Sequence, residues 1–134
     1  MKLNFGVAAA VLALSASAFA QTIAPVTVSR TVPTGKEWQI GFYASLNPDC
    51  SGAGDIDVRL TKKPQNGAVD LEPGPGFPTY QQNNPLHVCN TKNVQGVRLK
   101  YTSKEGYVGR DAFEVEILDP RGNDFVLKYS VTVK

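Results

Sequence analysis

Histidine is almost missing from this sequence, and its scarcity removes most routes to catalysis. His87 is the only histidine among 134 residues. A Ser-His-Asp triad would have to use it, yet no Gly-x-Ser-x-Gly segment is present to hold a nucleophile on a strained turn. We therefore expect no catalytic residues and a protein that is not an enzyme.

Ligands for metal ions are equally sparse. His87 and Cys89 would share one face of a strand and could hold copper, but a disulfide at Cys89 would remove the thiolate and leave one nitrogen ligand. Aspartates gather near two turns without the twelve-residue loop and terminal glutamate of a calcium-binding hand. We expect no cofactor and no metal site. The alternative is a small periplasmic metal carrier or enzyme that uses His87 and neighbouring polar groups.

Long apolar runs occur only at the N-terminus, where residues 1–20 have the pattern of a cleavable signal peptide. Lys2 supplies a positive start, residues 7–14 form a short apolar run, and residues 18–20 put small side chains before a cut. The apolar run is too short to cross a bilayer as a permanent helix. We expect residues 21–134 to form one exported domain, periplasmic or extracellular, with no membrane insertion after cleavage.

Clustered charge is also lacking. The chain has 14 lysines and arginines against 12 acidic residues, and without Lys2 the net charge is near +1. The longest basic run is the pair Lys62-Lys63. Because phosphate binding depends on clustered cations, the sequence predicts no nucleic-acid partner.

Only two cysteines are present, Cys50 and Cys89. In an oxidising compartment two thiols most often pair, so we expect a disulfide between them. The loop it closes would stabilise the fold by roughly 4 kcal/mol on the chain-entropy model. Two free thiols or a thiolate metal site are the alternatives.

Apolar and polar residues alternate along much of the chain, which is the pattern of half-buried strands. Pro25 predicts an edge strand at residues 23–32, because proline cannot donate to a ladder. A short strand is expected at residues 67–71, and the sequence DPRGND at 119–124 predicts a hairpin turn. The predicted inward rows are Trp38, Ile40, Phe42, Ala44 and Leu46; Ile56, Val58 and Leu60; Val97, Leu99 and Tyr101; Phe113, Val115 and Ile117; and Phe125, Leu127, Tyr129, Val131 and Val133.

These seven or so short strands, separated by glycine, proline, asparagine and aspartate, predict an all-β chain folded as an antiparallel sandwich. Residues 72–96 are the exception, since four prolines and several amides leave room for at most one short strand around 86–89. We expect this segment to be a long surface excursion held down by the disulfide.

The second half of the chain carries a more specific pattern. Residues 63–71, KPQNGAVDL, contain Pro-x-x-Gly-x-Val, and residues 97–133 contain a strand ending in Tyr-Thr, then aromatic-x-Gly-x-Asp-x-Phe, then an Asp-x-x-Gly turn. This pattern resembles the bacterial Ig-like and cadherin-like β-sandwich modules of exported proteins. The resemblance implies an Ig-like fold. Those modules usually occur in tandem arrays, whereas this chain holds one module, so its function must come from its own surface.

The resemblance also implies a structural corner at Tyr107, Gly109, Asp111 and Phe113. Gly109 lets the chain reverse, Tyr107 covers the end of the core, and Asp111 accepts backbone N–H groups before Phe113 re-enters the interior. Asp111 is then a capping residue, whose replacement by alanine would cost about 1 kcal/mol.

The proline-rich loop is the predicted binding surface. Long loops on a rigid scaffold commonly carry function, and exposed aromatic rings beside amides can stack on a sugar or dock a protein. The candidate residues are Phe77, Tyr80, Gln81, Asn83 and His87. The alternative is that Phe77 and Tyr80 fold back over an open end of the sandwich. The function expected is an exported, non-catalytic module that binds a protein or carbohydrate partner.

Overall fold

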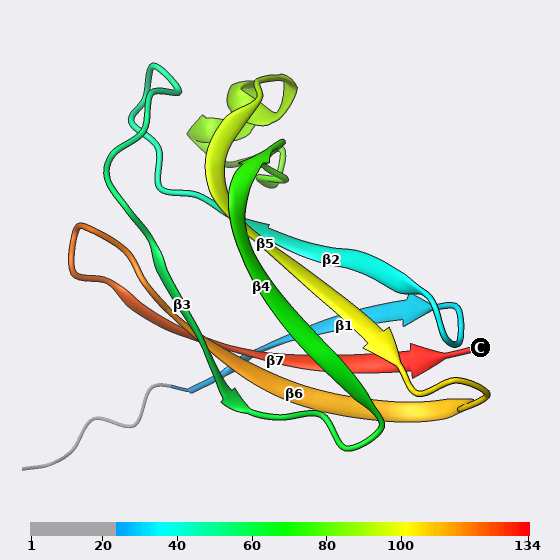
Figure 1. The fold of residues 1–134 in the computed structure, drawn as a ribbon. Coiled ribbons are helices and arrows are strands. Elements are labelled where there is room, and N and C mark those ends of the chain that lie inside the picture. The colour runs from blue at the N-terminus through cyan, green and yellow to red at the C-terminus, as the bar shows by residue number, and fades with distance from the viewer. Residues whose placement is uncertain (1–23) are drawn as a thin grey trace, which may run out of the picture.

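The computed structural model describes residues 24–134, so the expected signal peptide at residues 1–20 lies outside the described residues (Figure 1). Within that range, none of the helical structure has the length and apolar character needed to cross a bilayer. The elements are β1 (Val26–Val32), β2 (Glu37–Tyr43), β3 (Asp57–Lys62), β4 (Gly67–Gly76), the 3₁₀ helix η1 (Pro85–Thr91), β5 (Val94–Ser103), β6 (Gly109–Leu118) and β7 (Asp124–Val133).

The strands form two facing sheets, which confirms the predicted all-β sandwich of seven strands. One sheet has the order β1-β7-β6-β3 and the other the order β2-β5-β4. Every pair is antiparallel except β1 and β7, which run parallel with Val26 opposite Leu127. The hairpin of β6 and β7 turns at residues 119–123, as the sequence predicts.

The core lies where the inner faces of the two sheets meet. Alternate residues of β5, β6 and β7 are buried there, which confirms most of the predicted inward rows. Three rings stack through its centre: the Phe113 ring lies 6.1 Å from that of Tyr101 and 4.8 Å from that of Tyr129, measured between centroids. Stacked aromatic pairs add to the stabilisation that burial itself provides.

The predicted inward row of β2 is wrong in part, because a bulge changes which side chains face the core. The pairing of β2 with β5 shifts between Gln39 and Gly41, and Ile40 is the extra residue. A bulge puts two consecutive residues on one face. Beyond it Tyr43 points inward and shares a hydrogen bond with the Tyr129 hydroxyl, while Phe42 turns outward and its ring covers Gly76 and Gly96.

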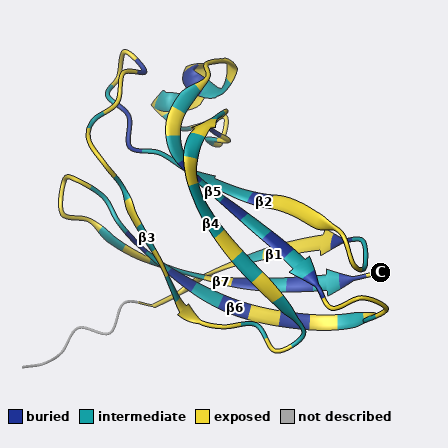
Figure 2. Cartoon of the chain, in the orientation of Figure 1, coloured by how far each residue is buried: buried dark blue, intermediate teal, exposed yellow. Residues whose placement is uncertain are grey.

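Trp38 and Phe125 were also expected inside and are not. Trp38 lies opposite buried Tyr101 but is 52% exposed, because β2 is an edge strand (Figure 2). Phe125 is 48% exposed at the start of β7. Phe125 is the second residue of β7, directly after the hairpin turn, so it lies at the end of its strand.

The proline-rich segment contains more regular structure than expected. β4 continues through Pro73 and Pro75 to Gly76, which is possible because β4 is the other edge of its sheet. The short strand expected at residues 86–89 is instead part of η1. Asn84 caps this 3₁₀ helix by accepting the Leu86 amide at 2.8 Å, and proline at 85 suits its first turn.

Candidate binding site

A cleft opens at the end of the sandwich that carries η1, between η1 and the turn that joins β6 to β7. We call it the apical pocket. Its volume is about 390 Å³, within the range of small-ligand sites. It is lined by residues from both sheets and from the loops above them: Phe42, Tyr43, Ala44, Ser45, Leu46, Ile56, Pro78, Thr79, Tyr80, Leu86, Ile117, Asp119, Arg121 and Phe125.

Four of the lining residues are aromatic: Phe42, Tyr43, Tyr80 and Phe125. Burial beside Tyr129 raises the pKa of Tyr43 well above its usual range, so its hydroxyl stays neutral at physiological pH. Rings of this kind offer large contact area at low conformational cost.

Tyr80 is fixed in place by bonds on two sides. The side chain of Asn90 accepts the Tyr80 amide and donates to the Tyr80 carbonyl, both at 2.9 Å. The Tyr80 hydroxyl donates to the Ala44 carbonyl at 3.3 Å, and partial burial raises the pKa of that hydroxyl. The ring is therefore held ready before any ligand arrives.

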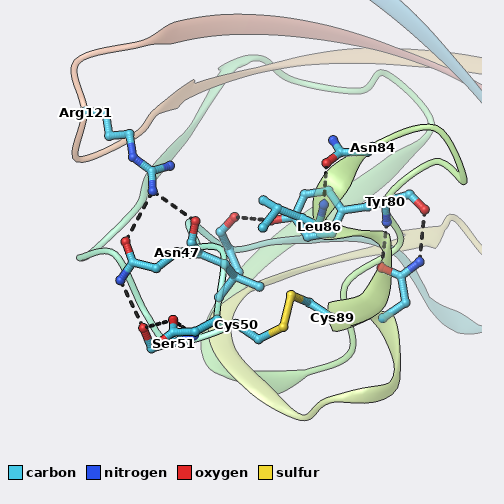
Figure 3. Close-up of a disulfide and its surroundings, with 12 residues drawn as sticks. Asn47, Cys50, Ser51, Tyr80, Asn84, Leu86, Cys89 and Arg121 are labelled. Atoms are coloured by element: carbon cyan, nitrogen blue, oxygen red, sulfur yellow. Dashed lines mark hydrogen bonds between the residues drawn. A yellow bond between two sulfur atoms is a disulfide. The ribbon is translucent and has the colours of Figure 1, made fainter.

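The disulfide joins the loop that follows β2 to η1 (Figure 3). Cys50 and Cys89 are bonded, which confirms the predicted bridge. Neither cysteine belongs to a strand, and both are buried beside Leu46 in a small cluster separate from the main core. Tyr80 and Leu86 pack on this cluster. The bridge thus holds η1 against the segment that follows β2.

The polar side of the pocket comes from the β6–β7 turn. Asp119 accepts the Arg121 and Asn123 amides, each at 2.9 Å, and the Asn123 side chain at 2.8 Å. These bonds hold the pKa of Asp119 below its ordinary value. Arg121 reaches across to the Leu46 carbonyl at 3.0 Å and to the Asn47 side chain at 3.4 Å, which ties the turn to the opposite loop (Figure 3).

The predicted loop residues do not form one site. Tyr80 lines the apical pocket, but Phe77, which is 55% exposed, does not. Gln81, Asn83 and His87 are exposed around η1 and outside the lining. Cys89 is bonded to Cys50, so it offers no thiolate to a metal beside His87. Within residues 24–134 no three histidine, cysteine or acidic side chains lie close enough together to hold a metal ion.

Sequence reasoning missed several residues of the pocket. Phe42 and Phe125 were assigned to the core by alternation, and Arg121 was regarded only as part of a turn. A signal for Phe125 was present, since a large apolar residue directly after a polar hairpin turn stands at the rim of a sandwich rather than in its middle. For Phe42 the sequence carried no such signal, because nothing in it marks the bulge at Ile40.

The predicted corner lies at the opposite end of the molecule. Asp111 is buried and accepts the Gln65 and Asn66 amides at 3.0 Å, the Ala112 amide at 2.9 Å and the Tyr101 hydroxyl at 2.8 Å. Tyr107 packs on the core, and its hydroxyl donates to the Arg110 carbonyl. The other two predicted members are Gly109, whose φ of 142° is one that glycine adopts readily, and Phe113, which is buried at 1% exposure.

A second groove, of about 670 Å³, lies on the other side of the segment from Ser45 to Ile56. It is the larger of the two, yet most of its lining is glycine backbone and polar loop residues, and it contains no aromatic ring. Anchoring side chains are what give a binding site its affinity. We therefore regard the apical pocket as the better candidate.

Comparison with known proteins adds little to this geometry. No protein-family model matches the sequence, and no curated protein matches it either. A solved structure described as the solution structure of amebosin is similar over 83% of this chain and 99% of its own, with 12% sequence identity and a TM-score of 0.44.

Proposed function

We propose that this chain is an exported, non-catalytic module of the Ig-like type that binds a protein or carbohydrate partner through the apical pocket. Export is supported by the signal-peptide pattern of residues 1–20 and by the disulfide, because such bridges persist in oxidising compartments. The fold assignment rests on the sequence pattern of residues 63–133. The periplasm and the cell exterior are the two locations that fit.

The observation that carries this proposal is that aromatic residues line a cleft whose walls are held in place. A disulfide, the two hydrogen bonds between Asn90 and Tyr80, and the hydrogen bond from Arg121 to the Leu46 carbonyl hold them. Preorganised aromatic groups in a concave site bind at low entropic cost. An apolar side chain of a protein or the flat face of a sugar ring would fit against Tyr80 and Phe125. The metal-carrier alternative finds no specific support, since Cys89 is already bonded.

The test compares three aromatic residues of nearly equal exposure. Phe125 is at the rim of the pocket, Phe77 lies in the predicted loop but outside the pocket, and Trp38 belongs to neither. Each is about half exposed, so its replacement by alanine should disturb folding little. Protein partners captured from the exported fraction would be identified, purified and titrated against each variant. An array of glycans would be probed with the same variants.

We expect Phe125→Ala to weaken binding about tenfold or more, as loss of an aromatic anchor does, while Phe77→Ala and Trp38→Ala leave it near the unmodified value. Loss of binding in Phe77→Ala alone would move the site to the loop. Equal affinity in all three variants would contradict the pocket as the binding site.

A further inference from the structure

A third hollow, distinct from the apical pocket and from the groove of about 670 Å³, lies on the outer face of the four-stranded sheet. It has a volume of about 560 Å³ and is formed by β3, β6, β7 and the loop that leads to β4, near the bottom of Figure 1. We call it the basal hollow. Exposed Ala112 forms its floor, and in the sheet register it lies opposite Ser130. Its rim carries four cationic side chains: Lys62, Lys63, Arg110 and Lys128.

Three of these cations are free to meet a ligand. Several basic residues elsewhere on the strands are paired: Arg59 with Asp57, and both Arg98 and Lys100 with Glu72. Within the part of the chain that the structure describes, Lys63, Arg110 and Lys128 form no such ion pair. Positive charge is therefore concentrated around one concave surface of a chain whose net charge is small.

Two carboxylates also line the hollow, but neither cancels that charge fully. Lys62 forms an ion pair with Glu114, in which the Lys62 Nζ lies 3.1 Å from a carboxylate oxygen. The Glu114 side chain is only 15% exposed. Asp111 is buried, and both of its oxygens already accept backbone amides. What faces solvent is thus predominantly ammonium and guanidinium.

The cations bracket the floor from its two ends. Arg110 lies opposite Thr132 and Glu114 lies opposite Lys128, so Arg110 and Lys128 are about 13 Å apart along the strands at the usual rise per residue. A ligand lying along the strands over Ala112 would bring one anionic group to Arg110 and another to Lys128. An arginine fork is well suited to a carboxylate.

The surroundings favour a polyhydroxylated ligand over a peptide. The hollow lies on the face of a sheet, where backbone groups are already paired, so it cannot add a strand. Among its lining residues only Ala112 and Phe113 are apolar, and the Phe113 side chain is buried in the core, so the hollow offers little surface to the large apolar anchor that protein partners use. The hydrogen-bonding groups that remain are side chains of Ser130, Gln65 and Asn66, which match sugar hydroxyls.

We propose that the basal hollow binds an acidic oligosaccharide, with one carboxylate at Arg110 and a second at Lys128. This site is separate from the apical pocket and does not depend on it. Because its contacts are ionic and solvent-exposed, its affinity should fall as salt is raised.

The experiment titrates the full exported chain by calorimetry with galacturonic acid oligosaccharides, and with the same oligosaccharides fully methyl-esterified as the neutral control. Variants Arg110→Gln and Lys128→Gln remove rim charges, and Lys92→Gln removes an exposed charge next to η1. All three positions are exposed, and thermal unfolding would verify that each variant folds.

We expect binding of the acidic form only, with affinity lowered about three- to tenfold by either rim substitution and unchanged by Lys92→Gln. Phe125→Ala should leave this binding intact, which separates it from the apical pocket. The proposal would be overturned if Lys92→Gln lowered the affinity as much as the rim substitutions, or if Phe125→Ala abolished binding. Binding of the esterified oligosaccharides, or no binding of the acidic ones, would also overturn it. So would equal or tighter binding of polyglutamate, or of inorganic phosphate.

Discussion

Replacement of Asp111 by alanine tests most directly the structural corner formed by Tyr107, Gly109, Asp111 and Phe113. Asp111 is 7% exposed, and its two oxygens accept three backbone amides and the Tyr101 hydroxyl. A hydrogen bond to a charged group contributes about 1.5–3 kcal/mol, but partly exposed donors regain water when it is lost. Only the Tyr101 bond is wholly buried. We therefore expect Asp111→Ala to lower the free energy of unfolding by about 3 kcal/mol, more than the roughly 1 kcal/mol of a surface cap.

Two further variants divide this loss between the two oxygens. Oδ1 accepts the Gln65 and Ala112 amides, while Oδ2 accepts the Asn66 amide and the Tyr101 hydroxyl. Asparagine would keep one acceptor and point an amide donor at the other pair, so Asp111→Asn should cost about 2 kcal/mol. Tyr101→Phe removes a single bond and should cost about 1 kcal/mol.

Urea unfolding followed by far-ultraviolet circular dichroism measures these differences, with unchanged slopes required for comparison. In the Asp111→Ala background, Tyr101→Phe should cost almost nothing, because the hydroxyl has already lost its acceptor. If Asp111→Ala costs under about 1 kcal/mol, or if Tyr101→Phe costs the same in both backgrounds, the reasoning fails.

Three other predictions follow from the described geometry. Replacing Cys50 and Cys89 by serine should lower stability by about 4 kcal/mol on the chain-entropy model, given their separation of 39 residues, and alkylation should label the native protein only after reduction. Gly41→Ala would bring a Cβ to 2.6 Å from the Tyr129 hydroxyl, so thermal unfolding should report a loss of about 2 kcal/mol, whereas Gly52→Ala, with no neighbour within 4 Å, should not. The lowered pKa of Asp119 stabilises the fold above the unfolded value of about 3.9, and this contribution disappears as the pH falls through the folded value. Asp119→Asn should therefore flatten the fall in stability under acid, and an unchanged acid profile would contradict the role given to this turn.

The fold was predictable from the sequence where strands lie in the middle of a sheet. The alternation of Val97, Leu99 and Tyr101 and of Phe113, Val115 and Ile117 matches what is buried, because each of these strands is hydrogen-bonded on both sides and turns one face to the core. The hairpin turn at 119–123 was predictable because proline and glycine act locally. The disulfide was predictable for another reason, since a chain with only two cysteines allows a single intramolecular pairing.

Edges and ends were not predictable in the same way. At Ile40 one extra residue reversed the alternation of β2, Trp38 lies on an edge strand, and Phe125 lies directly after a hairpin turn. Prolines in β4 suggested a loop, yet an edge strand tolerates them. The apical pocket is built from these edges and ends, so most of its lining, Phe42 included, could not be identified from sequence alone. Phe125 is the exception, because its position directly after the hairpin turn was a signal.

The parallel pairing of β1 with β7 has a consequence for how the chain reaches its native state. Val26 pairs with Leu127 and Val32 pairs with Val133, so β1 has no strand to pair with until β7 has been synthesised. Contacts between such distant segments slow folding, because loop entropy must be lost before they form. During synthesis from the N-terminus β1 would remain an unpaired strand until β7 has emerged, and any truncation that removes β7 would leave β1 unpaired permanently.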